Sequence, residues 1–309
     1  MRVIVLINPK ARIAHFRDSS ALHERIGESF AARGITARIV AAAGEALPEA
    51  ASAAVEAARR GEVDAVVTGG GDGSVGTVAG LLAGSRIPLG ILPLGTLNHF
   101  ARDLGIPPNL DGAIDLIADG ATRAIDVAEV NGHTFVNNSS VGIYAMLVLE
   151  RERLRNDHGL SKWAAMTLAC FRLLRRFSLR RITVTAEGRR MAHRTPLVFI
   201  GNNAYRLHPP ELGTRASLVD GLLWICVARQ QGRWQLLWLA CRSLLGVRLS
   251  LRDLEIVCAD AVEIGSRASR LPVAVDGEVR IIRPPLRYRV RPRALQVFAP
   301  PQTIEPEPH

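Results

Sequence analysis

Three glycines, a carboxylate, a fourth glycine and a hydroxyl follow one another at residues 69–74, after an apolar run at 63–68. The apolar run predicts a buried strand, and the pattern at 75–82 predicts a helix. A glycine-rich turn before a helix N-terminus presents backbone N–H groups that bind phosphate oxygens, which glycine allows to approach closely. The Asp72 carboxylate would repel phosphate alone. It therefore indicates a metal ion or a substrate hydroxyl beside the phosphate.

Residues 71–76 also match G-x-G-x-x-G, a pattern of dinucleotide-binding proteins. That pattern requires an Asp or Glu about 20 residues further on, which binds the ribose. Because residues 73–102 contain no acid, a nucleotide-dependent dehydrogenase is disfavoured. A Walker A loop is excluded, since no Gly-Lys-Ser or Gly-Lys-Thr occurs. An ordinary tight turn between a strand and a helix is the remaining alternative.

The composition is that of a basic protein of two domains. The chain has 309 residues and a formal net charge of +10. Such a charge attracts nucleic acid, anionic lipid or phosphorylated ligands. Because no apolar run reaches 18 residues, no transmembrane helix is expected. The four cysteines lack C-x-x-C spacing, which is typical of reduced thiols in a cytosolic protein.

Short apolar runs alternate with helical patterns over the first 120 residues, which predicts a parallel sheet covered by helices on both faces. Strands are expected at 2–7, 36–41, 63–68 and 88–92, and helices near 19–33, 46–60, 75–83 and 111–119. Ligands bind such sheets at the carboxyl ends of their strands. The loops that begin at residues 8, 69 and 93 should therefore meet at one edge and form a site.

From about residue 124 the pattern changes to short β-like runs separated by turns such as Asp220-Gly221 and Asp276-Gly277. This pattern predicts an antiparallel sandwich with helical inserts near 160–177 and 233–248. The last residues are rich in proline and should be disordered. The predicted division is 1–123 for the α/β domain, 124–299 for the β-rich domain and 300–309 for a disordered tail.

Taken together, these segments resemble the diacylglycerol kinase catalytic family, which includes bacterial lipid kinases and sphingosine kinase relatives. Residues 8–9, 70–74 and 93–101 resemble its opening Asn-Pro, its Gly-Gly-Asp-Gly-Thr signature and its Pro-Leu-Gly-Thr-x-Asn-Asp-Phe-Ala block. Four later landmarks follow in order, at 125–127, 135–137, 218–223 and 275–278. The chain departs from the family pattern at Ser74, at 76–77 and at His99, which stand where Thr, Asn-Glu and Asp are usual.

The resemblance implies a phosphofructokinase-like α/β N-terminal domain with a parallel sheet and a mainly antiparallel β-sandwich C-terminal domain. It also implies ATP- and Mg²⁺-dependent transfer of the γ-phosphoryl group to a lipid hydroxyl, as in diacylglycerol, a sphingoid base or ceramide. The first domain would bind the nucleotide and the second the lipid. Such transfer needs alignment, charge neutralisation by Mg²⁺ and a carboxylate that takes the hydroxyl proton.

The same resemblance assigns roles to individual residues. Asp276 is the first candidate for the catalytic base and Asp72 the second. Asp220 would hold a structural Mg²⁺, with Asp126 joined to it through water, since carboxylates and water suit Mg²⁺. The nucleotide contacts would come from Asn8, Lys10, Gly70, Gly71, Gly73, Ser74, Gly95, Thr96, Asn98 and Glu278.

We expect a cytoplasmic protein that works peripherally at the inner membrane surface. Helix 160–177 is basic and amphipathic, and Arg172, Arg175, Arg176 and Arg180 would meet anionic lipid. Packing of this helix on its own domain is the favoured alternative. Two other functions stay open: a kinase of a soluble acceptor, as in NAD kinase relatives, and a basic nucleic-acid-binding protein. The second is disfavoured because an aromatic content of 5% offers no base-stacking set, so no nucleic-acid partner is expected. The sequence leaves the lipid and the oligomeric state open.

Overall fold

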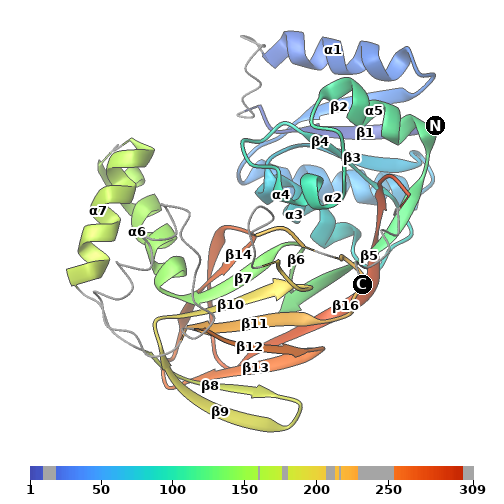
Figure 1. The fold of residues 1–309 in the computed structure, drawn as a ribbon. Coiled ribbons are helices and arrows are strands. Elements are labelled where there is room, and N and C mark those ends of the chain that lie inside the picture. The colour runs from blue at the N-terminus through green and yellow to red at the C-terminus, as the bar shows by residue number, and fades with distance from the viewer. Residues whose placement is uncertain are drawn as a thin grey trace. The chain divides into compact units, whose positions relative to one another are not determined.

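The computed structural model describes residues 1–9, 19–158, 161–175, 180–206, 213–215, 217–228 and 254–301. The chain divides into two compact units. Unit 1 comprises Met1–Val127 and Pro292–His309, and unit 2 comprises Ala128–Arg291. Figure 1 shows the elements of each unit.

Unit 1 contains a parallel sheet in the order β2-β1-β3-β4 (Figure 1). The inner strands β1 and β3 bury nearly every residue, which is typical of parallel strands with helices on both faces. Helices α1 and α5 contact each other, as do α2 and α3. The predicted α/β domain is thereby confirmed. Its strands are β1 (Arg2–Ile7), β2 (Thr36–Ala41), β3 (Ala65–Gly70) and β4 (Leu89–Pro93), and its helices are α1 (Ser19–Ala31), α2 (Ala46–Arg59), α3 (Asp72–Leu82), α4 (His99–Asp103) and α5 (Leu110–Asp119).

Unit 2 is an antiparallel sandwich, as predicted. One sheet contains β6 (His133–Phe135), β13 (Ala261–Ser266), β8 (Arg180–Ala186), β9 (Arg189–Thr195) and the parts of β5 (Thr122–Val130) and β16 (Leu286–Phe298) that belong to unit 2. The other has the order β12-β11-β10-β7-β14-β15, with bounds Leu254–Ala259, Leu223–Ala228, Leu197–Asn202, Asn138–Gly142, Leu271–Val275 and Glu278–Ile282. Buried side chains of both sheets, among them Val184, Ile264, Ile225 and Val273, form one hydrophobic core.

The chain enters unit 2 along β5 and returns along the long strand β16. The first half of β16 pairs with β13, and Val297 near its end pairs with Leu89 of β4. The sequence analysis assigned all of 124–299 to the second domain, whereas the contacts place residues 124–127 and 292–299 in unit 1. The reason is that β16 is one continuous strand with residues in both units, and a strand with no break offers no sequence signal of a boundary.

Two helices follow β7 in unit 2, α6 (Ile143–His158) and α7 (Lys162–Arg175). Helix α6 was not predicted. Helix α7 packs on it through Leu154, Ala165 and Ala169, in agreement with the packing alternative for helix 160–177. The second predicted insert, 233–248, and residues 302–309 of the predicted tail lie outside the described residues. No helix in the described part of the chain has the length and apolar content to cross a membrane.

The turn from β7 into α6 depends on Gly142. Its φ of +114° is strained for any L-residue, and an added Cβ would overlap the carbonyl oxygen of Pro196. We expect Gly142→Ala to lower the free energy of unfolding by more than about 1 kcal/mol in denaturant titrations. Gly132→Ala is the matched control, because Gly132 also has positive φ but has open space around it. Equal losses in both variants would show that the clash with Pro196 has no effect.

Candidate functional site

Three loops of unit 1 meet at the carboxyl ends of the adjacent strands β1, β3 and β4. The backbone N–H of Asn8, after β1, donates to the Gly69 carbonyl at 2.9 Å. The Asn8 side-chain amide donates to the Ser74 hydroxyl of the next loop at 3.3 Å. The expected convergence of the loops at one edge of the sheet is therefore confirmed.

Glycines allow the loops after β3 and β4 to touch through their backbones. A Cβ on Gly95 would overlap the Cα of Gly71 and stand 2.7 Å from the Asn98 side-chain oxygen. A Cβ on Gly70 would stand 2.8 Å from the Ser74 hydroxyl oxygen. Gly95 is thus required by packing between two loops and Gly70 by packing within its own turn, in addition to any closeness to a ligand.

Asn98 shapes the loop after β4 with its own side chain. Its backbone is left-handed, with φ of 49°. Its Oδ1 accepts from the Gly95 N–H at 2.9 Å, and its Nδ2 donates to the carbonyls of Gly95 and Pro93 at 2.9 and 3.0 Å. The sequence analysis gave Asn98 a nucleotide contact, but the structure uses its amide to hold the loop. Thr96 of the same loop is exposed.

Asp72 is the first residue of α3, and its carboxylate joins two loops. It accepts from the backbone N–H groups of His99 at 3.2 Å and Phe100 at 3.0 Å, where α4 begins. The carboxylate thereby caps α4, whose N-cap residue makes no side-chain capping bond. The first-turn N–H groups of α3, at Gly73 and Ser74, have no acceptor within their helix. This end of α3 can bind an anion.

Asp276 in unit 2 lies in a nest of three backbone N–H groups. Its Oδ2 accepts from Val136 at 2.8 Å, and its Oδ1 accepts from Asn137 and Asn138 at 2.9 and 3.1 Å. Its own N–H donates to the Asn138 carbonyl at 2.9 Å. Burial raises the pKa of this carboxyl to about 6, although the three amide bonds and the Arg215 charge each lower it.

Arg215 supports the same segment and was not predicted as a site residue. Its buried guanidinium donates to the Val136 carbonyl at 2.5 Å and to the Asn137 side-chain oxygen at 2.9 Å. The Tyr205 hydroxyl donates to the Asn137 carbonyl at 3.1 Å, and the guanidinium lies 5.8 Å from the Tyr205 ring centre. Arg215 and Tyr205 thus hold the carbonyl side of the segment whose N–H groups bind Asp276.

The two predicted metal ligands lie in different units. Asp126 is fully buried in unit 1 and accepts from the backbone N–H of Arg293 at 2.8 Å, where φ is +49°. Asp220 is exposed in unit 2, and burial followed by the Asp220 charge raises the pKa of the nearby Cys258 thiol. Among the described residues, no group of three or more His, Cys, Asp or Glu side chains is placed to hold a metal ion.

Two further predicted contacts have simple surroundings. Glu278 is exposed at the start of β15, and its carboxylate lies 3.5 Å from the Arg280 guanidinium. Lys10 lies outside the described residues.

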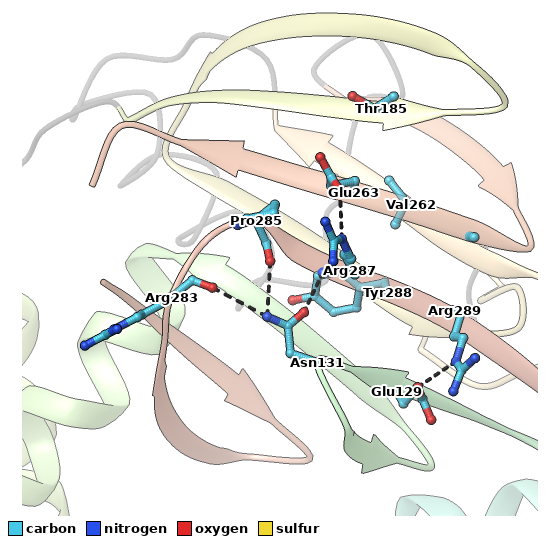
Figure 2. Close-up of a pocket in the computed structure, with 11 residues that line it drawn as sticks. Glu129, Asn131, Thr185, Val262, Glu263, Arg283, Pro285, Arg287, Tyr288 and Arg289 are labelled. Atoms are coloured by element: carbon cyan, nitrogen blue, oxygen red, sulfur yellow. Dashed lines mark hydrogen bonds and ion pairs between the residues drawn. The ribbon is translucent and has the colours of Figure 1, made fainter. Parts of the chain in front are cut away.

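A hollow of about 790 Å³ opens on unit 2, and none of the predicted site residues lines it. Figure 2 shows Asn131 bridging the Arg283 and Pro285 carbonyls and the Arg287 N–H. Arg287 and Arg289 in this hollow pair with Glu263 and Glu129 at 3.1 and 2.6 Å. The hollow therefore contains paired charges, and we assign it no chemistry.

Two family models match the chain and together cover most of it. Residues 2–130 match the diacylglycerol kinase catalytic domain, and residues 140–299 match the YegS C-terminal NAD kinase beta sandwich-like domain. A crystal structure of a diacylglycerol kinase from Bacillus anthracis shares the fold, with a TM-score of 0.68 and 22% identity over 97% of both chains.

Curated relatives carry related names. A diacylglycerol kinase of Mycobacterium tuberculosis is 29% identical over 77% of this chain, and lipid kinase YegS of Escherichia coli is 36% identical over 55% of it. The matched segments span 77% and 58% of these relatives' own lengths, and 56% of a Synechocystis relative. With both family models matched in order, the chain belongs to the diacylglycerol kinase family, in the branch that has the YegS-type C-terminal domain.

Proposed function

We propose that this protein is a lipid kinase that transfers the γ-phosphoryl group of ATP to a lipid hydroxyl with Mg²⁺. The observation that carries the proposal is the junction in unit 1, where two glycine loops touch and the N-terminus of α3 is left open to an anion. That junction lies within the matched diacylglycerol kinase catalytic domain. The names of the relatives support a lipid as the acceptor.

In unit 1 the first-turn N–H groups of α3 would face the nucleotide phosphates. They are strong donors in fixed positions, and they cost no reorganisation when charge develops on the phosphoryl group. Mg²⁺ in kinases is held by one or two carboxylates together with substrate phosphates. The partly exposed Asp72 fits such a role, and a larger cluster of protein ligands is not needed.

In unit 2 Asp276 would take the proton of the lipid hydroxyl. A base is most effective when its pKa lies near the working pH, and a pKa of about 6 meets that condition. A carboxylate has about four acceptor positions, and three of them are used by Val136, Asn137 and Asn138. One position is left to accept the hydroxyl proton.

Incubation of the pure protein with labelled ATP, Mg²⁺ and a total lipid extract tests the proposal. We expect label in a chloroform-soluble product, whose mass identifies the lipid. Parallel reactions with NAD and sugars test a soluble acceptor, and filter binding of labelled ATP against RNA tests the nucleic-acid alternative. Label found only in water-soluble product across a broad lipid panel would refute the proposal.

Asp276→Asn should lower kcat by roughly 10²–10⁴-fold, because the base is lost. In the wild type, kcat/KM should rise with pH up to about 6 and then level off, since the carboxylate must be ionised to accept a proton. Thermal unfolding is measured in parallel, because the Asn amide would place a donor against a backbone N–H. A folded variant that keeps wild-type kcat and the same pH profile would place the base elsewhere.

Arg215→Gln should move the acid limb of the same pH profile to higher pH. The guanidinium charge lowers the pKa of Asp276, so its removal raises that pKa further. Arg206→Gln is the control, because Arg206 also lies between β10 and β11 but is not among the groups that shift the pKa of Asp276. An unchanged acid limb in a folded Arg215→Gln protein would separate Arg215 from the titration of the base.

Asp72→Asn should weaken ATP binding rather than alter the pH profile. The amide can accept only one of the two bonds from His99 and Phe100, so the loop after β4 would loosen. We expect the KM for ATP to rise, with unit 1 destabilised by about 1 kcal/mol in denaturant titrations. If the acid limb near pH 6 disappears while the KM stays constant, Asp72 is the base.

A further inference from the structure

Strands β13, β8 and β9 are neighbours in one sheet of unit 2 (Figure 1), and several arginines of these strands are exposed. In β8, Arg181 is exposed while Ile182 and Val184 are buried, so alternate residues face outward. Exposed Arg194 of β9 lies opposite Arg181 in the ladder, and exposed Arg190 lies opposite Thr185. These side chains therefore share one face of the sheet.

A fourth arginine, Arg267, follows the end of β13, where Ser266 pairs with Ile182. Arg181, Arg190, Arg194 and Arg267 line one open hollow of about 570 Å³, called here the arginine face. Like charges directly opposite each other in a ladder are destabilising, yet Arg181 stands opposite Arg194. Within the described ranges, no carboxylate lies within 4 Å of these four guanidinium groups.

The neighbouring arginines of the same sheet form ion pairs with carboxylates, unlike those of the arginine face. Arg287 and Arg289 are paired with Glu263 and Glu129, as Figure 2 shows. Arg172 of α7, which the sequence analysis assigned to the membrane, is paired with Glu150 at 2.8 Å. The arginine face thus carries an uncompensated positive charge, while these arginines are neutralised.

The hollow is also lined by the small residues Thr183, Ala192, Gly265 and Ser266, and by Ile182 and His193. Ile182 and His193 alternate with Arg181 and Arg194 along β8 and β9, so their side chains belong to the other face of the sheet. Guanidinium groups bind phosphate oxygens with two parallel hydrogen bonds. The aromatic ring in this lining, that of His193, belongs to the opposite face, where its Nδ1 lies 3.9 Å from a Glu255 carboxylate oxygen. The arginine face therefore presents no ring on which a nucleic-acid base could stack.

We propose that the arginine face docks on the phosphate headgroups of an anionic lipid membrane. The inference rests on the proposed function only in that a lipid substrate brings the protein to a bilayer. A charged edge strand such as β9 also discourages edge-to-edge pairing of sheets. Edge protection alone would give a variant that associates with itself but still binds vesicles.

The test compares Arg181/Arg190/Arg194→Gln with a matched control, Arg25/Arg59/Arg60→Gln. Both variants lose three positive charges, but the control arginines are exposed in unit 1 and paired with Asp111, Glu56 and Glu62. Sedimentation is measured with phosphatidylcholine vesicles and with vesicles that also contain phosphatidylglycerol, at low and high salt. At about a factor of 5 per arginine, we expect the first variant to bind anionic vesicles about 100-fold more weakly at low salt. The control should bind like the wild type.

Kinase activity on a detergent-solubilised lipid separates this inference from the proposed function. The arginine-face variant should keep that activity while losing activity on anionic vesicles. The wild type could show no lipid kinase activity while the arginine-face variant alone loses vesicle binding. That result would support the docking face and refute the proposed function. Equal vesicle binding by both variants would overturn the docking face. It would also be overturned if the arginine-face variant lost only RNA binding, or only became self-associated while still binding vesicles.

Discussion

Three carboxylates, two in unit 1 and one in unit 2, each accept hydrogen bonds from backbone N–H groups of a distant segment. Asp72 accepts from His99 and Phe100, Asp126 from Arg293, and Asp276 from residues 136–138. Each contact joins segments that are 27 to 167 residues apart in sequence. A hydrogen bond to a charged group is worth about 1.5–3 kcal/mol, and its loss leaves a polar group unpaired. These three carboxylates therefore fix the loops and strand ends on which the proposed chemistry depends.

The same bonds limit what each carboxylate can do. At Asp276 burial outweighs three amide bonds and the Arg215 charge, and a rise in pKa from 3.8 to about 6 corresponds to about 3 kcal/mol. A group with such a pKa exchanges a proton easily near neutral pH. Asp72 binds only two N–H groups and is partly exposed, which suits it better to holding a loop and an ion. The structure thus separates two aspartates that look alike in sequence, since each precedes a glycine.

Local patterns predicted the parts of the fold that depend on local sequence. The continuous apolar runs of β1 and β3 predicted a parallel sheet, and the loops at their carboxyl ends met as expected. Arg215 could not be found in this way, because it contacts residues 79 positions away and belongs to no motif. Asn98 was recognised as part of a block, but its bonds within the loop appear only in three dimensions. The return of β16 into unit 1 was missed for a related reason, since strand pairing is not encoded by the strand alone.

The central claim is that Asp276 is a partly buried carboxylate able to take a proton near neutral pH. Nuclear magnetic resonance of protein labelled with ¹³C at the aspartate carboxyl carbons follows its ionisation directly, with Asp276→Asn used to assign the signal. The account predicts a titration midpoint near 6, which moves to higher pH in Arg215→Gln. A midpoint at or below the ordinary value of 3.8 would contradict it, because the three N–H groups would then outweigh burial.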